Sequence, residues 1–172
     1  MGKILVVFYS RRGQNYVSGS IKELKVGNTE VVAKMVKEIA DGDLYQIDTV
    51  KKYPLDYHEA TVVAQKELRE KARPELTEEV SNMEEYDTII LGYPNWWGTM
   101  PMAVYTFLES YDLSNKTIIP FCTHEGSGLG RSEKDIQKLC PKAKMLKELA
   151  IHGTNAANAE KDLLKWLKDI VK

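Results

Sequence analysis

IILGYPNWWGTMP, residues Ile89–Pro101, joins a run of apolar residues to a loop that carries two adjacent tryptophans. Apolar runs without alternation are typical of a strand that is covered on both faces of a sheet. Two indoles on a loop rich in Pro, Gly and Asn are harder to explain by packing alone, because α/β proteins hold ligands on the loops that follow their strands. The stretch therefore predicts a buried strand that ends at a ligand site.

Segments with strand and helix patterns alternate along the rest of the chain. Strands are expected at Lys3–Tyr9, Asp43–Val50, Tyr86–Tyr93, Lys116–Cys122 and Ala143–Ile151. Helices are expected at Asn28–Ala40, Tyr57–Ala72, Pro101–Tyr111, Ser132–Leu139 and Ala159–Val171. Such an alternation forms βαβ units, whose right-handed crossovers place a parallel sheet between two layers of helices. Residues 1–172 are expected to form one α/β domain, a three-layer sandwich.

Composition excludes several classes of function. Lys and Arg number 24 and Asp and Glu 25, so the net charge of −1 argues against general nucleic-acid binding and against a strongly acidic docking surface. No apolar run reaches the ~20 residues that span a bilayer, and the N-terminal run is interpreted as the first strand rather than a signal peptide. Cys122 and Cys140 form no CxxC pair and are expected to be buried, reduced thiols in a cytoplasmic protein.

The loop after the first strand, SRRGQNYVSGSIKELKVGN from Ser10 to Asn28, has the ends of a phosphate cradle. Ser10 follows the strand directly, while Asn28 and Thr29 open a helix whose free N–H groups and dipole attract anions. Arg11 and Arg12 could add positive charge. Alternatively, Asn28 or Thr29 only caps the helix and Ser10 only turns the chain. The loop is long for a compact domain, which fits a lid, a binding loop or a surface insertion.

The loop from Tyr93 to Met100 carries Trp96 and Trp97. Indole faces can stack on a planar heterocycle, and the backbone of a turn restricted by Gly and Pro can reach its polar edge. The alternative is that the tryptophans are core or interface residues. We expect at least one of the two to contact a ligand.

The loop from Thr123 to Arg131, THEGSGLGR, lets the backbone approach a ligand closely because three of its residues are glycines. These glycines are spaced by two and follow the fourth strand, which does not match a Rossmann dinucleotide fingerprint. His124 and Glu125 could form an acid/base pair, although such residues more often orient a ring or face solvent. In a parallel sheet all three loops emerge at the carboxyl edge, where together they predict a site for a mononucleotide with a flat ring.

The segments YPNWWGTMP (Tyr93–Pro101) and PFCTHEGSGLG (Pro120–Gly130) resemble the flavodoxin-like family, and the resemblance covers essentially the whole chain. It implies a five-stranded parallel sheet in the order 2-1-3-4-5 and non-covalently bound flavin mononucleotide, FMN. By match to the family, Ser10, Asn28 and Thr29 would hold the phosphate. The ring would lie between two loops that contribute Pro94, Asn95, Trp96, Trp97 and Gly98 on one side and Thr123, Glu125, Gly126 and Gly128 on the other.

Two features depart from that family. The segment Arg11–Val26 separates Ser10 from Gly27, where the family has a short Ser/Thr-rich run. This insertion either bulges away from the cradle or folds over the cofactor and adds contacts, for example from Asn15. The near-neutral charge also differs from the strong acidity of flavodoxins that serve as electron carriers, which steers them to basic partners.

The expected function is electron transfer through FMN, to a redox partner protein or a small-molecule acceptor, with no catalytic side chain and no metal. One alternative is an NAD(P)H-dependent, FMN-containing quinone or flavin reductase, and another is a cofactor-free binding module on the same fold. A response regulator is disfavoured because it needs acidic residues at the ends of the first and third strands. Tyr9–Ser10 and Tyr93–Pro94 stand there instead.

Overall fold

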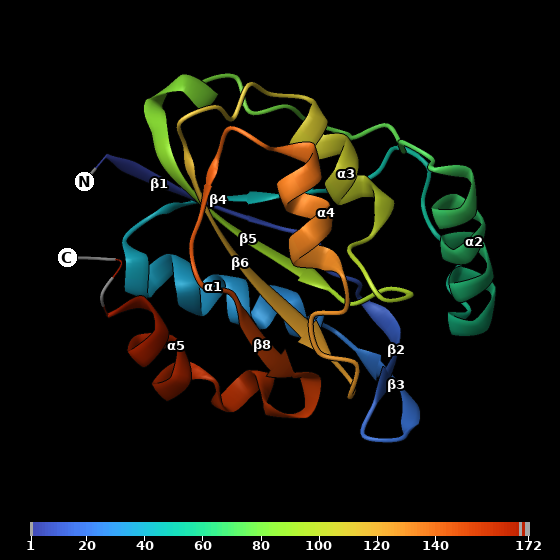
Figure 1. Cartoon of the computed structure of the whole chain (residues 1–172). Helices are drawn as coiled ribbons and strands as arrows, with labels where there is room; N and C mark the ends of the chain where they lie inside the picture. The colour runs from blue at the N-terminus through green and yellow to red at the C-terminus, as the bar shows by residue number, and fades with distance from the viewer. Residues whose placement is uncertain (1, 169, 171–172) are drawn as a thin grey trace.

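The computed structural model describes residues 2–168 and 170, which are organised around a parallel β-sheet (Figure 1). Its strands are β1 (Lys3–Phe8), β4 (Asp43–Gln46), β5 (Tyr86–Pro94), β6 (Thr117–His124), β7 (Lys144–Met145) and β8 (Leu149–His152). They are ordered β4-β1-β5-β6-β7, with β8 also paired to β6, and every pairing is parallel. With β7 and β8 taken as two parts of one fifth strand, this is the predicted 2-1-3-4-5 order.

Helices cover both faces of the sheet. One face packs against α1 (Asn28–Ala40) and α5 (Glu160–Leu167), and the other packs against α3 (Met102–Glu109) and α4 (Ser132–Leu139). Helix α2 (Tyr57–Glu70) stands at one side in Figure 1, and among its described residues only Ala60 and Ala64 are buried. The short 3-10 turns η1 (Met83–Glu85) and η2 (Gly153–Asn158) precede β5 and α5. The predicted three-layer α/β architecture is confirmed.

The sequence of β1 explains why the sheet needs two helical layers. Leu5 and Val7 enter the core beneath α3 and α4, whereas Val6 and Phe8 enter the core beneath α1 and α5. Successive side chains of a strand point to opposite faces, so an unbroken apolar run is satisfied only when both faces are covered.

The fifth strand is divided where the prediction had one strand over Ala143–Ile151. Ile118 pairs with Met145 and Phe121 with Leu149, so the fifth strand has one residue more than β6 over this interval. The carbonyl oxygen of Ile118 accepts from the N–H of the residue after Met145, and the backbone of Pro120, two positions further on, faces the same neighbour. Because Pro has no N–H to donate, the ladder is interrupted at this point.

The long first loop contains an antiparallel hairpin that the sequence reading did not predict. Strands β2 (Gly13–Val17) and β3 (Ser20–Leu24) pair over their full length. Ser18 and Gly19 connect them with φ angles of 53° and 86°, the left-handed values of a two-residue type I′ turn. The insertion is therefore an ordered ribbon.

Other boundaries differ by a few residues. The second strand ends at Gln46 rather than Val50, since the chain then leaves the sheet and Thr49 bridges to Leu76 instead. The predicted end of the last helix at Val171 lies outside the described residues. Both cysteines are free and buried, and no helix in the described part of the chain is long and apolar enough to cross a membrane.

Candidate functional site

A cavity of about 460 Å³ lies at the carboxyl edge of the sheet, beyond the ends of β1, β5 and β6. This volume is in the range of pockets that hold small molecules and cofactors. The three loops singled out in the sequence all contribute to its wall, together with the β2–β3 hairpin and α2. The lining residues are Ser10, Arg11, Asn15, Tyr16, Asn28, Thr29, Tyr57, Ala60, Thr61, Ala64, Pro94, Asn95, Trp96, Trp97, Gly98, Thr123, His124, Glu125, Ser127 and Gly153.

Among the residues predicted for the site, Arg12, Gly126 and Gly128 lie outside this lining. The Arg12 guanidinium binds the carboxylate of Glu30 through two hydrogen bonds of 2.9 and 2.8 Å, which turns it away from the cavity. Gly128 instead supports the wall, because its carbonyl oxygen accepts from the side-chain amide of Asn95 at 2.8 Å. All the other predicted residues line the cavity.

One end of the cavity is formed by the start of α1. The hydroxyl oxygen of Ser10 accepts from the N–H of Glu30 at 3.1 Å, which fixes the end of β1 against the first turn of the helix. A Cβ at Gly27 would collide with the Ser10 hydroxyl and the Arg11 backbone. Since the first N–H groups of a helix lack intrahelical acceptors and carry its positive dipole end, this region can hold an anion.

Thr29 joins α1 to β6 rather than presenting a free hydroxyl. Its hydroxyl lies 2.7 Å from that of Thr123, and both side chains are buried. The polar side chains that remain available at this end are therefore those of Ser10 and Asn28, beside the backbone of the first helical turn.

Trp97 and Gly98 are the central residues of a tight turn. Trp96 and Thr99 exchange two backbone hydrogen bonds, of 2.8 and 3.3 Å, and the φ angles of Trp97 and Gly98 are 56° and 87°. These values define a second type I′ turn, and they are uncommon for a residue as bulky as Trp. The turn is held by the Asn95 side chain, which accepts from the Gly98 N–H at 2.9 Å.

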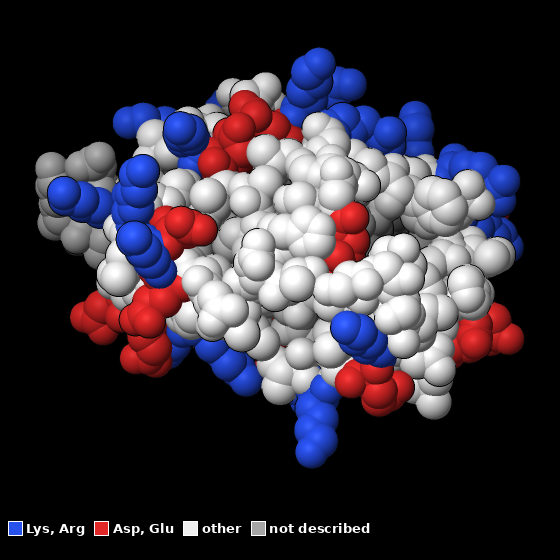
Figure 2. All heavy atoms as spheres, turned by 90° about the horizontal axis from the view of Figure 1, so that it is seen from below, with Lys and Arg blue, Asp and Glu red and all other residues white. Residues whose placement is uncertain are grey.

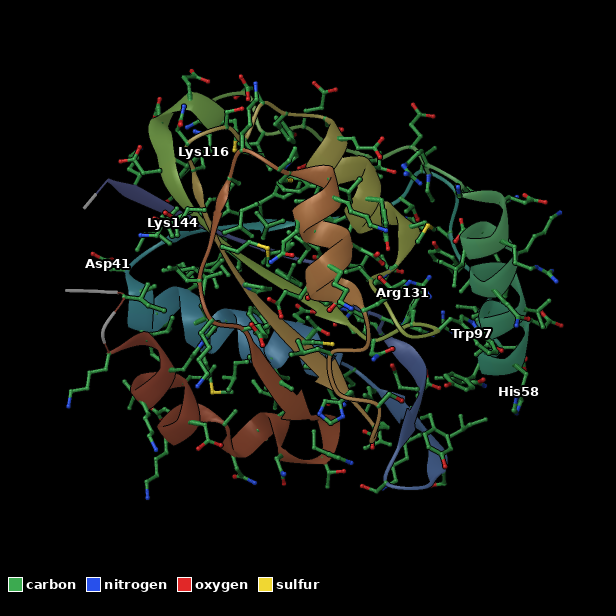
Figure 3. The ribbon with its side chains drawn as sticks, viewed as in Figure 1. Asp41, His58, Trp97, Lys116, Arg131 and Lys144 are labelled. Carbon is green, nitrogen blue, oxygen red and sulfur yellow. The ribbon has the colours of Figure 1, made fainter. Side chains whose placement is uncertain are left out.

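The two indoles have different surroundings. Trp96 packs edge-on against Tyr9 and Tyr53, each with ring centroids 5.2 Å apart, and so fastens the turn to the core. Trp97 is 49% exposed, and its Nε1 donates to the carbonyl oxygen of Thr61 on α2 at 2.9 Å. Figure 3 shows Trp97 extending from the turn toward α2 and His58. Trp96 therefore anchors the loop, while Trp97 closes the cavity against α2.

Glu125 lines the cavity and has one buried acceptor that is unsatisfied. Its Oε1 is buried without a hydrogen-bond partner among the described residues, while Oε2 accepts from the Ser18 N–H at 3.3 Å and lies 3.7 Å from His152 Nδ1. A Cβ at Gly153 would lie 2.5 Å from Oε1 and 2.6 Å from Asn28 Nδ2, so glycine lets both side chains pack against the backbone here. An unpaired buried acceptor costs about 1–3 kcal/mol.

Among the described residues, His124 and Glu125, considered as an acid/base pair, make no hydrogen bond to each other. The His124 Nδ1 accepts from the Gly126 N–H at 2.9 Å, and the His124 ring packs edge-on against His152. Burial and the neighbouring His152 lower the pKa of His124 below its usual value of 6.5, which favours the neutral imidazole at the cavity wall.

Several lining residues were missed by the sequence reading. Tyr16 of the hairpin stacks on Tyr57 at the start of α2, with centroids 6.4 Å apart and an interplanar angle of 26°. Ala60, Thr61 and Ala64 form the face of α2 that closes this side. Their spacing of three and four residues signalled one helix face, but the sequence carried no signal that this face would meet the cavity.

Comparison with known proteins identifies the family. A sequence profile of the flavodoxin family matches residues 3–170. The chain therefore belongs to the flavodoxin family. No curated protein sequence matches it significantly.

Solved structures agree with this assignment. A protein from Bacteroides uniformis, provisionally described as a flavoprotein, shares 32% identity with a TM-score of 0.77, over 97% of this chain and 98% of that one. A protein from Bacteroides eggerthii, described in the same way, shares 28% identity with a TM-score of 0.79, over 100% and 99% of the two chains. A flavoprotein from Lactobacillus acidophilus in complex with FMN has the same fold, with 17% identity, a TM-score of 0.68, and coverage of 92% and 98%.

Proposed function

We propose that residues 1–172 form one FMN-binding domain that transfers electrons through flavin held non-covalently in the cavity. The observation that supports this most strongly is the convergence of three features in one cavity: the open start of α1, the Trp96–Thr99 turn and the carboxylate side chain of Glu125. FMN offers a dianionic phosphate, a planar ring and several N–H and hydroxyl donors. It therefore matches each of the three, and membership in the flavodoxin family supports the same cofactor.

In this proposal, different residues bind different parts of FMN. Ser10 and Asn28, with the N–H groups of the first turn of α1, hold the phosphate. Pro94, Asn95, Trp96, Trp97 and Gly98 form one wall of the ring site, and Thr123, Glu125, Gly126 and Gly128 belong to the loop on the opposite wall. Asn15 adds a polar group from the hairpin. Arg12 lies outside the cavity lining and supports the start of α1 through its ion pair with Glu30.

When bound, the flavin supplies the redox chemistry by accepting and passing on electrons or hydride. The chain binds and orients it and excludes water from its ring through Trp96, Trp97 and the backbone of their turn. Burial raises the pKa of the nearby Cys122 thiol to about 12, so this thiol stays protonated and takes no part. No side chain is assigned as a general acid or base.

Carrier and reductase functions are distinguished by the electron donor. Figure 2 shows Lys and Arg interspersed with Asp and Glu around a largely uncharged centre on the face over α1, α5 and the hairpin. The net charge of −1 provides no strong field for steering toward a basic partner. Membership in the flavodoxin family supports the carrier role, in the cytoplasm, which we put first. The weak field leaves an NAD(P)H-dependent reductase of small molecules as the second candidate.

We expect the purified protein to be yellow, with flavin absorbance that is released on denaturation. In anaerobic titration, a carrier keeps its oxidised spectrum in NADH or NADPH until a flavin-dependent reductase is added. Bleaching by the nicotinamide alone within seconds would instead establish the reductase. A colourless protein that also fails to bind added FMN would contradict both and favour a cofactor-free binding module.

The two tryptophans should respond differently to truncation. Trp96→Ala removes a half-buried indole from the Tyr9 and Tyr53 contacts, so it should lower the free energy of unfolding by about 3 kcal/mol. Trp97→Ala should change that free energy by only about 1 kcal/mol, because this side chain is half exposed and loses one hydrogen bond, from Nε1 to Thr61. It should nevertheless weaken FMN binding about tenfold through lost stacking. Urea unfolding and FMN titration measure the two effects; equal effects of both variants on both quantities would contradict the division of roles.

A further inference from the structure

We propose that Asp135 on α4 is a positioning residue, which holds the Trp96–Thr99 turn in place from outside the cavity before any flavin binds. The inference rests on the proposed function, because that function places the flavin ring against this turn. Among the described residues, neither Asp135 nor Thr99 belongs to the cavity lining. Asp135 therefore acts on a ligand only through the turn that it fixes.

The turn needs support because its backbone conformation is unfavourable for Trp97. The φ angle of 56° at this residue lies in the left-handed region, which bulky side chains rarely adopt. Such a conformation persists only where the surrounding contacts determine it. The Trp97 indole is half exposed, and its Nε1 donates to the carbonyl oxygen of Thr61 on α2. Contacts on the other side of the turn must therefore supply the remaining support.

Thr99 fastens one end of the turn to a cluster of three oxygen atoms. Its hydroxyl donates to Asp135 Oδ2 at 2.6 Å and lies 2.7 Å from the Tyr105 hydroxyl, which donates to the same carboxylate oxygen at 2.5 Å. Both hydroxyl-bearing residues are buried. Burial and the bond to Asp135 raise the pKa of Tyr105, so its hydroxyl remains a donor. Hydrogen bonds to a carboxylate are about twice as strong as neutral ones, so this attachment is firm.

The segment that leads to Asp135 holds the middle of the turn. The Arg131 N–H donates to the Gly98 carbonyl oxygen at 2.8 Å, and a Cβ at Gly130 would collide with that oxygen. The Asp135 N–H donates to the Arg131 carbonyl oxygen at 3.1 Å, and Arg131 Nε lies 3.3 Å from Asp135 Oδ2. The start of α4 therefore contacts the turn at two points, the backbone of Gly98 and the side chain of Thr99.

These contacts make the turn a preorganised wall of the ring site. Ordering a loop when a ligand binds costs free energy, and a wall that is already ordered avoids this cost. Without the Asp135 carboxylate, the Thr99 hydroxyl keeps Tyr105 as a partner but loses its attachment to α4. The turn should then sample other conformations, because the strain at Trp97 is opposed by fewer contacts. The ring site should lose affinity, while the phosphate site at the start of α1 stays as it is.

Two substitutions break the same contact from opposite sides. Asp135→Ala removes the acceptor, and Thr99→Val removes the donor with little change of shape. Asp135→Asn keeps an oxygen acceptor and is the conservative variant that should restore the contact. Gln137→Ala, at an exposed position of the same helix, is the matched control. The two single variants and their double variant form a thermodynamic cycle.

The first readout is hydrogen exchange of the Gly98 and Thr99 amides in flavin-free protein, which reports the order of the turn. We expect exchange about tenfold faster in Asp135→Ala and in Thr99→Val, and unchanged exchange in Gln137→Ala.

The second readout is the Kd for FMN and for riboflavin. Each single variant should weaken both ligands about tenfold, because the turn lies on the ring side of the site. The double variant should also weaken them about tenfold rather than about a hundredfold, since Asp135 and Thr99 act through one contact. Asp135→Asn should stay within about threefold of the wild type.

A general loss of stability gives a different result. It lowers the free energy of unfolding in urea but leaves the Kd unchanged as long as the protein is folded during the titration. Exchange rates or Kd values that neither substitution changes, or additive losses in the double variant, overturn the proposal while FMN binding stands.

Failure of the proposed function is recognised separately. A wild type that binds neither FMN nor riboflavin overturns that function and the effect on the ring site, whereas the exchange rates still show whether Asp135 orders the turn. If Asp135→Ala does not fold, Thr99→Val gives the same two readouts and leaves the contact between Asp135 and Tyr105 intact.

Discussion

Asn28→Asp should weaken FMN binding about a thousandfold and change riboflavin binding by less than about threefold. Asn28 is the first residue of α1 and lines the cavity at the proposed phosphate site. Asp has nearly the same size, so the substitution adds one negative charge and little else. At about 4 Å and an effective dielectric constant of about 20, two unit charges repel by about 4 kcal/mol, which corresponds to the expected loss.

The fold should not suffer from this substitution. A negative charge in the first turn favours the helix dipole, which offsets the repulsion from the nearby Glu125 carboxylate, so α1 should remain folded while FMN is rejected. Asn115→Asp makes the same change on an exposed loop just before β6, far from the carboxyl edge, and serves as the control. Flavin fluorescence titration measures all three proteins. Equal losses of FMN and riboflavin, or no loss of either, would contradict the placement of the phosphate.

Phe121→Ala should lower the free energy of unfolding by about 3–5 kcal/mol, the largest stability effect we expect from a single truncation. Phe121 is fully buried between the sheet and the layer of α1 and α5, and its ring packs edge-on against Trp166. It also covers Gly92, its partner in the β5–β6 register. A Cβ at Gly92 would collide with the Phe121 ring, so Gly92→Ala should itself cost about 1–3 kcal/mol.

The two effects should not add. Once the ring of Phe121 is gone, Gly92→Ala should cost nothing or stabilise slightly, because the added methyl group enters the vacated space. Phe107 is equally buried but lies in the core on the other face of the sheet, so Phe107→Ala combined with Gly92→Ala should be additive. Urea unfolding of the five variants and the wild type measures both cycles. Additive behaviour in the Gly92–Phe121 cycle would contradict the close packing that positions β5 and the turn after it.

The resemblance to the flavodoxin-like family was sufficient for the sheet order, and the residue pattern was sufficient for α1, whose predicted bounds Asn28–Ala40 agree with the structure. Local signals were strong there: Gly27 and Asn28 mark the start, and the amphipathic pattern ends at Ala40. The hairpin was missed although Ser18–Gly19 is a recognisable two-residue turn. Most of the residues in its strands are exposed or half exposed. Alternation of apolar and polar residues identifies a strand only when one of its faces is buried, so this signal is missing here.

The residues of the candidate site that lie on a single loop could be predicted from the sequence. Those that reach the site from distant segments could not. The Pro94–Gly98 wall follows from one loop at one sheet edge, and it lines the cavity. The orientation of Arg12 depends on the burial of Glu30, and the contribution of Ala60 and Ala64 depends on where α2 is placed. Neither arrangement is encoded in local spacing, because both arise from tertiary packing across the cavity.

Titration of FMN into flavin-free protein, followed by absorbance and by quenching of flavin fluorescence, tests the central claim most directly. The structure predicts saturable binding of one FMN per chain with a Kd below about 1 μM, equivalent to a binding free energy of about −8 kcal/mol or better. Binding should be weakened by Asn28→Asp and by Trp97→Ala. Absence of saturable binding, or binding that is indifferent to both substitutions, would contradict a flavin site in this cavity.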